Sequence, residues 1–156
     1  MRELQNIELI GKILIKKNKK NMCLTKIDNS NLEQFRNGKG YKIYHLHNKK
    51  LYSIFKTLEG ASIIFGQEEC IKPLPLHTEF TAKSRKIASQ LTGDYDAGFH
   101  IFVDEKQARI YMEELGFCLN FVIVEVEYKN AHTMGIDQFD TLVVVAQKMT
   151  IKKILS

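Results

Sequence analysis

The last third of the chain holds the feature that most constrains the fold, two strand-like segments in succession. In "FVIVEVEYK", residues 121–129, the even positions are three valines and a tyrosine, and the odd positions up to 127 are Phe, Ile and two glutamates. Successive side chains of a strand point to opposite faces, so this alternation predicts one buried face and one that becomes exposed toward its end. "TLVVVAQ", residues 141–147, is nearly all apolar, which predicts a central strand covered on both faces. The "MTIKKIL" that follows either extends this strand or forms a last edge strand.

The segment "DEKQARIYMEELG", residues 104–116, predicts a helix directly after the strand "GFHIF", residues 98–102. Asp104 is a suitable N-cap, and Gln107 stands three residues later, as in a capping box. Gly116 stands where a helix often ends in a left-handed residue. Apolar side chains at helical spacing predict one buried stripe: Ala108, Tyr111, Met112 and Leu115. The two elements together predict a strand–helix corner.

A hairpin is predicted earlier in the chain, over "YKIYHLHNKKLYSIF", residues 41–55. Apolar and polar residues alternate on both sides of a polar "HNKK" turn. This pattern places Tyr41, Ile43 and His45 on one face of the first strand.

Two helical segments are predicted besides the one after Asp104. "TEFTAKSRKIASQLTG", residues 78–93, predicts a helix with Thr78 as its N-cap and a glycine at its end. "SNLEQFRNGKG", residues 30–40, predicts a short helical turn that ends at its two glycines.

Together these elements predict one α+β domain, residues 1–156, in which two main helices pack on a mostly antiparallel sheet. Residues 1–40 are expected to form a basic N-terminal segment, and residues 41–156 the core sheet and helices. The length suits a single domain. The three cysteines are far apart and in no CxxC pair, which argues against disulfides and a structural zinc site and favours the cytosol. The N-terminal apolar stretch is too short to span a membrane, so no membrane partner is expected.

Charge is distributed unevenly along the chain. Residues 1–56 hold thirteen Lys and Arg against four Asp and Glu, whereas residues 57–156 hold ten against fourteen. Such asymmetry indicates either an anionic partner for one side of the molecule or a solvated lysine-rich surface. Lysines that neutralise phosphates, with tyrosines that stack on bases, also suit a nucleic acid. The expected binding residues belong to "KKNKK" and "NKKLY": Lys16, Lys17, Lys19, Lys20, Lys49, Lys50 and Tyr52.

Several ionisable residues lie within predicted strands. His45 and His47 are spaced i, i+2, so both imidazoles point to one side, but no third ligand stands at a fixed spacing and no metal site is expected. Glu125 and Glu127 have the same spacing and mark either a half-covered cleft wall or, as we favour, the exposed end of a strand. His100, before the helix, is either a displayed functional group or a structural residue, and we favour the structural role.

The succession of "YKIY…KLYSIF", "GFHIF…A", "FVIVEVE" and "VVVAQKM" over residues 41–155 resembles small accessory proteins of phages and prophages of low-GC bacteria. The resemblance implies a small single domain that works by binding. Inhibitors of host nucleases or defence systems, such as anti-CRISPR proteins, are the expected class.

A second resemblance is to the ADP-ribosyltransferase fold of the poly-ADP-ribosyl and RNA 2′-phosphotransferase type. "YH" ending at His45, "GFH" ending at His100 and "EVE" beginning at Glu125 occur in the order of that family's strand motifs. The resemblance implies NAD as the cofactor. It also implies that His45 holds the nicotinamide ribose, that the segment around His100 flanks the nicotinamide, and that Glu125 is catalytic.

Three hypotheses for function result. The first is a phage-type binding protein without a cofactor, whose basic N-terminal side docks on a host protein or nucleoprotein complex in the host cytosol. The second is an NAD-binding, ADP-ribosyltransferase-like enzyme that uses His45, His100 and Glu125. The third is a nucleotide sponge, in which lysines and backbone amides hold phosphates without chemistry. The second hypothesis depends on whether its three residues share one pocket.

Overall fold

The structure is a computed structural model that describes residues 24–52, 73–82, 86–87, 95–115 and 121–155. Its described elements are β1 (Lys26–Ile27), η1 (Leu32–Phe35), β2 (Gly38–His47), β3 (Lys50–Tyr52), β4 (Glu79–Thr81), β5 (Lys86–Ile87), β6 (Tyr95–Asp96), β7 (Phe99–Phe102), α2 (Glu105–Leu115), β8 (Phe121–Ile136) and β9 (Leu142–Ile154). The pairings among these strands are antiparallel, as predicted. None of the described helices is long and apolar enough to cross a membrane.

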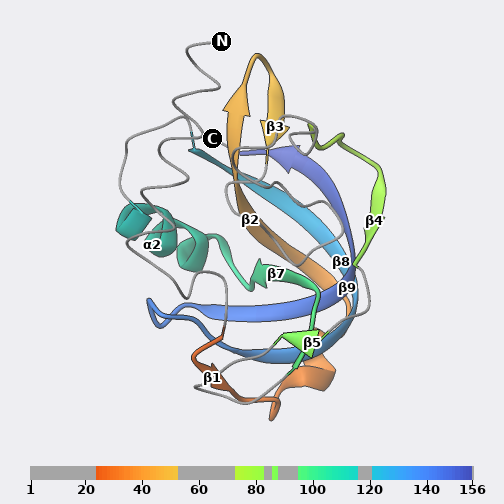
Figure 1. The fold of residues 1–156 in the computed structure, drawn as a ribbon, viewed down its shortest axis with the longest axis vertical. Helices are drawn as coiled ribbons and strands as arrows, with labels where there is room; N and C mark the ends of the chain where they lie inside the picture. The colour runs from red at the N-terminus through yellow and green to blue at the C-terminus, as the bar shows by residue number, and fades with distance from the viewer. Residues whose placement is uncertain (1–23, 53–72, 83–85, 88–94, 116–120, 156) are drawn as a thin grey trace.

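Four strands form a closed ring of hydrogen-bonded neighbours. β8 pairs with both β9 and β2, β9 pairs with β7, and β7 meets β2 through one residue pair, Tyr41 opposite Phe102. Register shifts after Glu125 and after Ala131 mark where the β8–β9 ladder bends. The result is a strongly curved, barrel-like sheet (Figure 1). β1, β3 and β4 are added at its margins by pairing with β8, β2 and β9.

The inside of this ring is the first apolar core. Val124 and Val126 are fully buried there, so the even positions of β8 form the buried face that the alternation predicts. The facing strands contribute further fully buried side chains: Phe99, Ile101, Val144, Met149 and Ile151. β9 runs between β7 and β8, with residues 143–146 buried. "TLVVVAQ" is therefore the central strand that was expected, and "MTIKKIL" extends it.

A second apolar core joins helix α2 to the outer face of the ring. Ala108 and Tyr111 are buried against Phe102, and the ring centroids of Tyr111 and Phe102 lie 5.2 Å apart. Asp104 caps the helix, because its carboxylate accepts the Gln107 N–H at 2.9 Å. The prediction of a capping box is wrong. The Gln107 side-chain oxygen instead accepts the N–H of Leu142, the first residue of β9, at 3.0 Å. The predicted strand–helix corner is confirmed.

The sequence predicts a second main helix over residues 78–93. This prediction is wrong for the part of the segment that the structure describes. Glu79–Thr81 is strand β4 on β9, and Lys86–Ile87 is strand β5 on β6. Helical periodicity is overridden because the edge of β9 offers hydrogen bonds to the backbone of β4. Residues 83–85 and 88–93, like Gly116 at the predicted end of α2, lie outside the described residues.

The short helical turn is confirmed as η1, but the glycines predicted to end it, Gly38 and Gly40, belong to β2. Gly40 lies where β2 passes closest to β7. A methyl group at Gly40 would lie 2.3 Å from Ile101 Cγ2 and 2.8 Å from the Phe102 carbonyl oxygen. The missing side chain therefore allows the ring to close.

Candidate functional site

The structure keeps His45, His100 and Glu125 apart. β2 and β8 pair without a register shift, so His45 lies opposite Phe121 and Glu125 lies opposite Tyr41. The two residues are four positions apart along one ladder, which corresponds to about 13 Å at 3.3 Å per residue. His100 lies on β7, which is separated from β8 by β2 on one side and by β9 on the other. The three residues that the ADP-ribosyltransferase-like hypothesis requires in one pocket therefore lie on different strands and do not form a common site.

His100 is a buried residue whose two ring nitrogens are both hydrogen-bonded. Nδ1 lies 3.3 Å from the Gly98 carbonyl oxygen, and Nε2 lies 3.0 Å from the Tyr95 hydroxyl. Because a carbonyl only accepts, we assign the proton to Nδ1, and Nε2 then accepts from the Tyr95 O–H. The Tyr95 oxygen in turn accepts the Leu24 N–H at 3.1 Å. Burial, followed by the charge of Lys42, lowers the pKa of His100 to about 3. The neutral imidazole thus ties residue 24 and β6 to β7.

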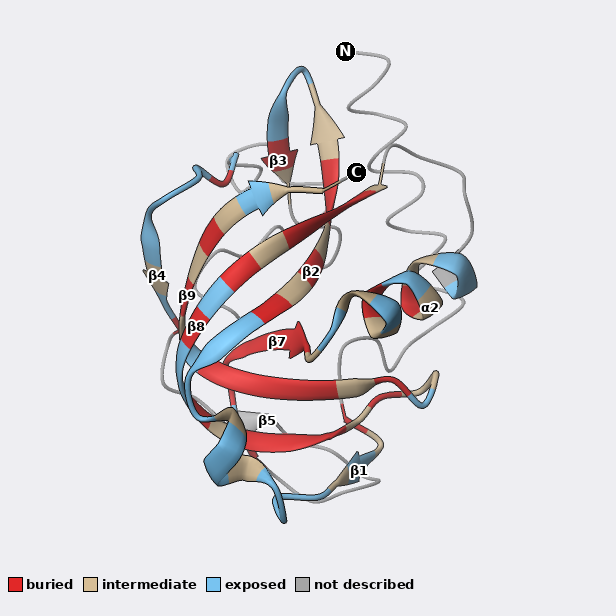
Figure 2. Cartoon of the chain, turned by 180° about the vertical axis from the view of Figure 1, so that it is seen from behind, coloured by how far each residue is buried: buried red, intermediate tan, exposed pale blue. Residues whose placement is uncertain are grey.

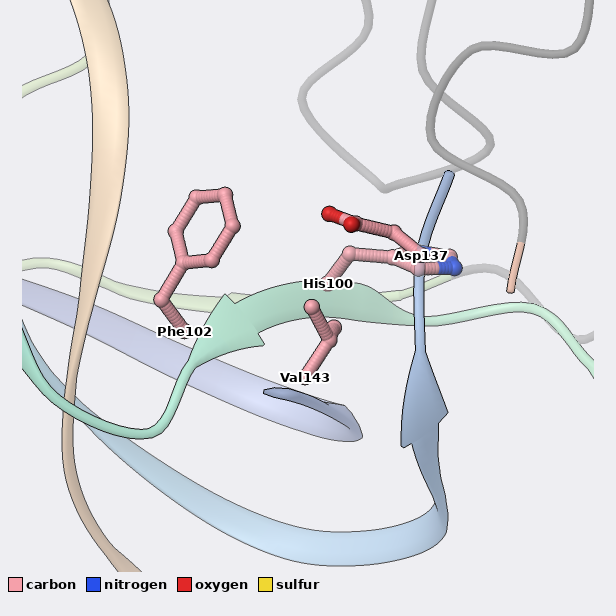
Figure 3. A pocket seen from close by; sticks show the side chains of 4 residues that line it. All are labelled: His100, Phe102, Asp137 and Val143. Carbon is pink, nitrogen blue, oxygen red and sulfur yellow. The ribbon is translucent and has the colours of Figure 1, made fainter. Parts of the chain in front are cut away.

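A small hollow beside His100 has little room for a ligand. The side chains that line it are His100, Phe102, Asp137 and Val143 (Figure 3). Its volume of about 10 Å³ is at the lower limit for one water molecule. Burial raises the pKa of Asp137, but its carboxylate already accepts the Thr141 hydroxyl at 2.5 Å and the N–H groups of Phe139 and Thr141. Asp137 therefore organises the turn between β8 and β9.

Glu125 and Glu127 lie on the outer side of β8. Glu125 Oε1 is 3.4 Å from Lys39 Nζ, and Glu127 Oε2 is 3.5 Å from Lys152 Nζ. The exposed fraction of the side chain rises from 21% at Glu125 to 48% at Glu127. The prediction that they mark the exposed end of a strand is wrong, because β8 continues to Ile136 and most of its residues from Ala131 onward are buried again. The two carboxylates balance lysines on the sheet surface, and such pairs contribute at most about 1 kcal/mol each.

The β2–β3 hairpin extends beyond the ring at one end of the molecule (Figure 1). Asn48 and Lys49 form its two-residue turn with φ values of 49° and 62°, as a type I′ turn requires, so the predicted "HNKK" turn is confirmed. Lys49 and Lys50 are exposed (Figure 2), and neither forms an ion pair with a described residue. Four other lysines each pair with a glutamate: Lys39, Lys129, Lys148 and Lys152. The hairpin turn therefore presents two adjacent positive charges that no described carboxylate balances.

One side of this hairpin is built from rings. Tyr52 lies opposite His45 and Lys50 lies opposite His47, so these four side chains point to the same side. The ring centroid of His47 lies 6.4 Å from that of Tyr52 and 6.3 Å from that of His45. We call His45, His47, Lys50 and Tyr52 the imidazole–tyrosine face. Leu51, on the other side, is buried in the first core and anchors the hairpin.

His45 is the buried member of the imidazole–tyrosine face, with 4% of its surface exposed and its ring edge-on to Phe121. Burial, followed by the charge of His47, lowers the pKa of His45, so its ring is neutral at pH 7. Its Nδ1 has no hydrogen-bond partner among the residues that the structure describes. A buried nitrogen left unsatisfied costs about 1–3 kcal/mol of stability, which the packing of the ring has to offset.

The hairpin brings together three of the predicted binding residues, Lys49, Lys50 and Tyr52, whereas the lysines of "KKNKK", residues 16–20, lie outside the described residues. His47 belongs to the same face, although its spacing from His45 only suggested a metal pair. No group of three His, Cys, Asp or Glu side chains in the described ranges is arranged to hold a metal ion. What the face offers is imidazole and phenol rings beside lysine charge.

Comparison of the chain with protein-family models, with curated proteins and with solved structures finds no match. The two resemblances in the sequence therefore remain predictions. Function has to be argued from the chemistry of the site itself.

Proposed function

We propose that the protein is a phage-type accessory binding protein that acts in the host cytosol and docks through the β2–β3 hairpin on an anionic surface of a host protein or nucleoprotein complex. Inhibition of a host nuclease or defence complex is the concrete form of this function. The proposal rests on one observation, the exposed Lys49–Lys50 pair without an ion-pair partner among the described residues.

The construction of the hairpin supports a docking role. Its turn has only two residues and its inner side is anchored by buried Leu51, so the lysines are presented from a defined backbone. An unbalanced positive turn speeds encounter with an anionic partner, and this effect weakens as salt rises. The basic stretch at residues 16–20 adds charge of the same sign within the sequence.

Capture from a host lysate at low salt tests the proposal, with the double variant Lys49→Glu/Lys50→Glu. The matched control is Lys106→Glu/Lys153→Glu, because these two lysines are also exposed and form no ion pair with a described residue. We expect the wild type and the control to retain one partner that the hairpin variant loses and that added salt releases. Recovery of the same partner by the hairpin variant would contradict the proposal.

A further inference from the structure

The imidazole–tyrosine face combines the two chemistries that single-stranded nucleic acids need. Aromatic side chains stack on bases of any sequence, and lysines neutralise the phosphates between them. Tyr52 and His47 are half-buried, so both residues keep some contact with solvent. Lys50 points to the same side as these rings, and Lys49 adjoins it in the turn.

The buried ring of the face, His45, is held by packing rather than by ion pairing. His45, next to His47, is buried and its pKa is lowered by burial, so the positive charge of the face comes from the lysines rather than from this imidazole. Its Nδ1 has no hydrogen-bond partner among the described residues, so this nitrogen can still accept or donate one hydrogen bond.

The position of the face favours single-stranded over double-stranded nucleic acid. It lies on a hairpin that extends beyond the ring (Figure 1), so it suits a base that is already unstacked and accessible. The bases of a duplex are paired and stacked, and only its phosphates are within reach of the lysines.

We infer that the imidazole–tyrosine face binds single-stranded nucleic acid, with a base stacked on Tyr52 beside His47, whose ring is tilted by 57° to that of Tyr52, and the neighbouring phosphates on Lys50 and Lys49. This inference rests on the proposed docking role of the hairpin and names the anionic partner. A nucleoprotein target with an exposed single strand then fits better than an acidic protein.

Fluorescence anisotropy with a labelled oligo(dT) strand at low salt tests the inference. We expect Tyr52→Ala to weaken binding about tenfold, because one lost base stack is worth roughly that factor or more. Tyr52→Phe keeps the ring and is expected to bind like the wild type, and circular dichroism checks that both variants fold. Lys49→Gln/Lys50→Gln is expected to flatten the slope of log affinity against log salt by about 1.4, for two phosphate contacts to a single strand.

Each outcome decides between the inference and the proposed function. Binding by Tyr52→Ala within twofold of wild type, or equal binding of strand and duplex, overturns the stacking contact. If no strand binds while the lysate partner is still lost in Lys49→Glu/Lys50→Glu, the docking role stands and the partner is an acidic protein. If thymidine monophosphate competes as well as the strand on a nucleotide basis, the face is a nucleotide site and the inference is wrong.

Discussion

The structural role of His100 can be tested by comparing how stability depends on pH in the wild type and in the variant His100→Gln. In the folded protein the imidazole is neutral and donates to Gly98 while it accepts from Tyr95. Glutamine places an amide oxygen near the position of Nε2, so it keeps an acceptor for the Tyr95 hydroxyl but has no proton to gain. The two proteins therefore differ in their pH dependence, whatever the cost of the substitution at pH 7.

The sign and size of the effect follow from the two pKa values. The pKa of His100 is about 3 in the folded protein and about 6.5 in an unfolded chain, so between these pH values the unfolded state binds one more proton. The contribution of His100 to stability is complete above pH 6.5 and is lost as pH falls. At 1.36 kcal/mol per unit, the loss reaches about 2 kcal/mol at pH 5 and about 4–5 kcal/mol near pH 3. That is a large share of a typical domain stability of about 5–15 kcal/mol.

Urea unfolding at pH 7 and pH 5, followed by far-ultraviolet circular dichroism, measures this loss. The chain has no tryptophan, so circular dichroism is the more suitable signal. We expect the free energy of unfolding of the wild type to fall by about 2 kcal/mol more than that of His100→Gln between the two pH values. His45, whose pKa is also lowered, titrates in both proteins and cancels in the comparison. Parallel losses in the two proteins would refute the assignment of His100 as a buried neutral residue.

Three further predictions concern other parts of the molecule. Gly40→Ala is expected to lower the free energy of unfolding by about 1–3 kcal/mol, because the new methyl group would lie 2.3 Å from a side-chain carbon of β7. Gly38→Ala is the control, since the nearest atom to its new methyl group would be 3.4 Å away. Equal urea midpoints for the two variants would contradict the close approach at Gly40. Thr141→Val removes the hydroxyl that donates to Asp137, so we expect the free energy of unfolding to fall by about 1–3 kcal/mol at pH 7. This loss should shrink as the Asp137 carboxyl protonates at lower pH. A loss that is independent of pH would contradict the hydrogen bond to a carboxylate. Calorimetry with NAD and ADP-ribose is expected to show no heat, whereas binding that Glu125→Ala abolishes would restore the enzyme alternative.

Much of the candidate site follows from local sequence. The "HNKK" turn sets the hairpin register, and this register alone places Tyr52 opposite His45 and Lys50 opposite His47. Lys49, Lys50 and Tyr52 are therefore accessible to prediction as one group. What the sequence does not reveal is that the two lysines form no ion pair with any carboxylate the structure describes, because Glu79, Glu125 and Glu127 are distant in sequence and reach other lysines only through the sheet.

The sequence by itself determines the elements whose signals are local: the hairpin turn, the strand–helix corner capped by Asp104, and the two-faced alternation of β8. Turn chemistry, caps and side-chain periodicity depend on residues a few positions apart, so a single sequence contains them. Only the tertiary structure decides that Glu79–Thr81 is a strand, that Gln107 bonds to β9, and that His100 is buried among Tyr95 and Gly98. The first two outcomes depend on hydrogen-bond partners from distant parts of the chain. The hydrogen-bond partners of His100 are near in sequence, but β7, which carries it, is flanked by β2 and β9, and these strands are distant in sequence.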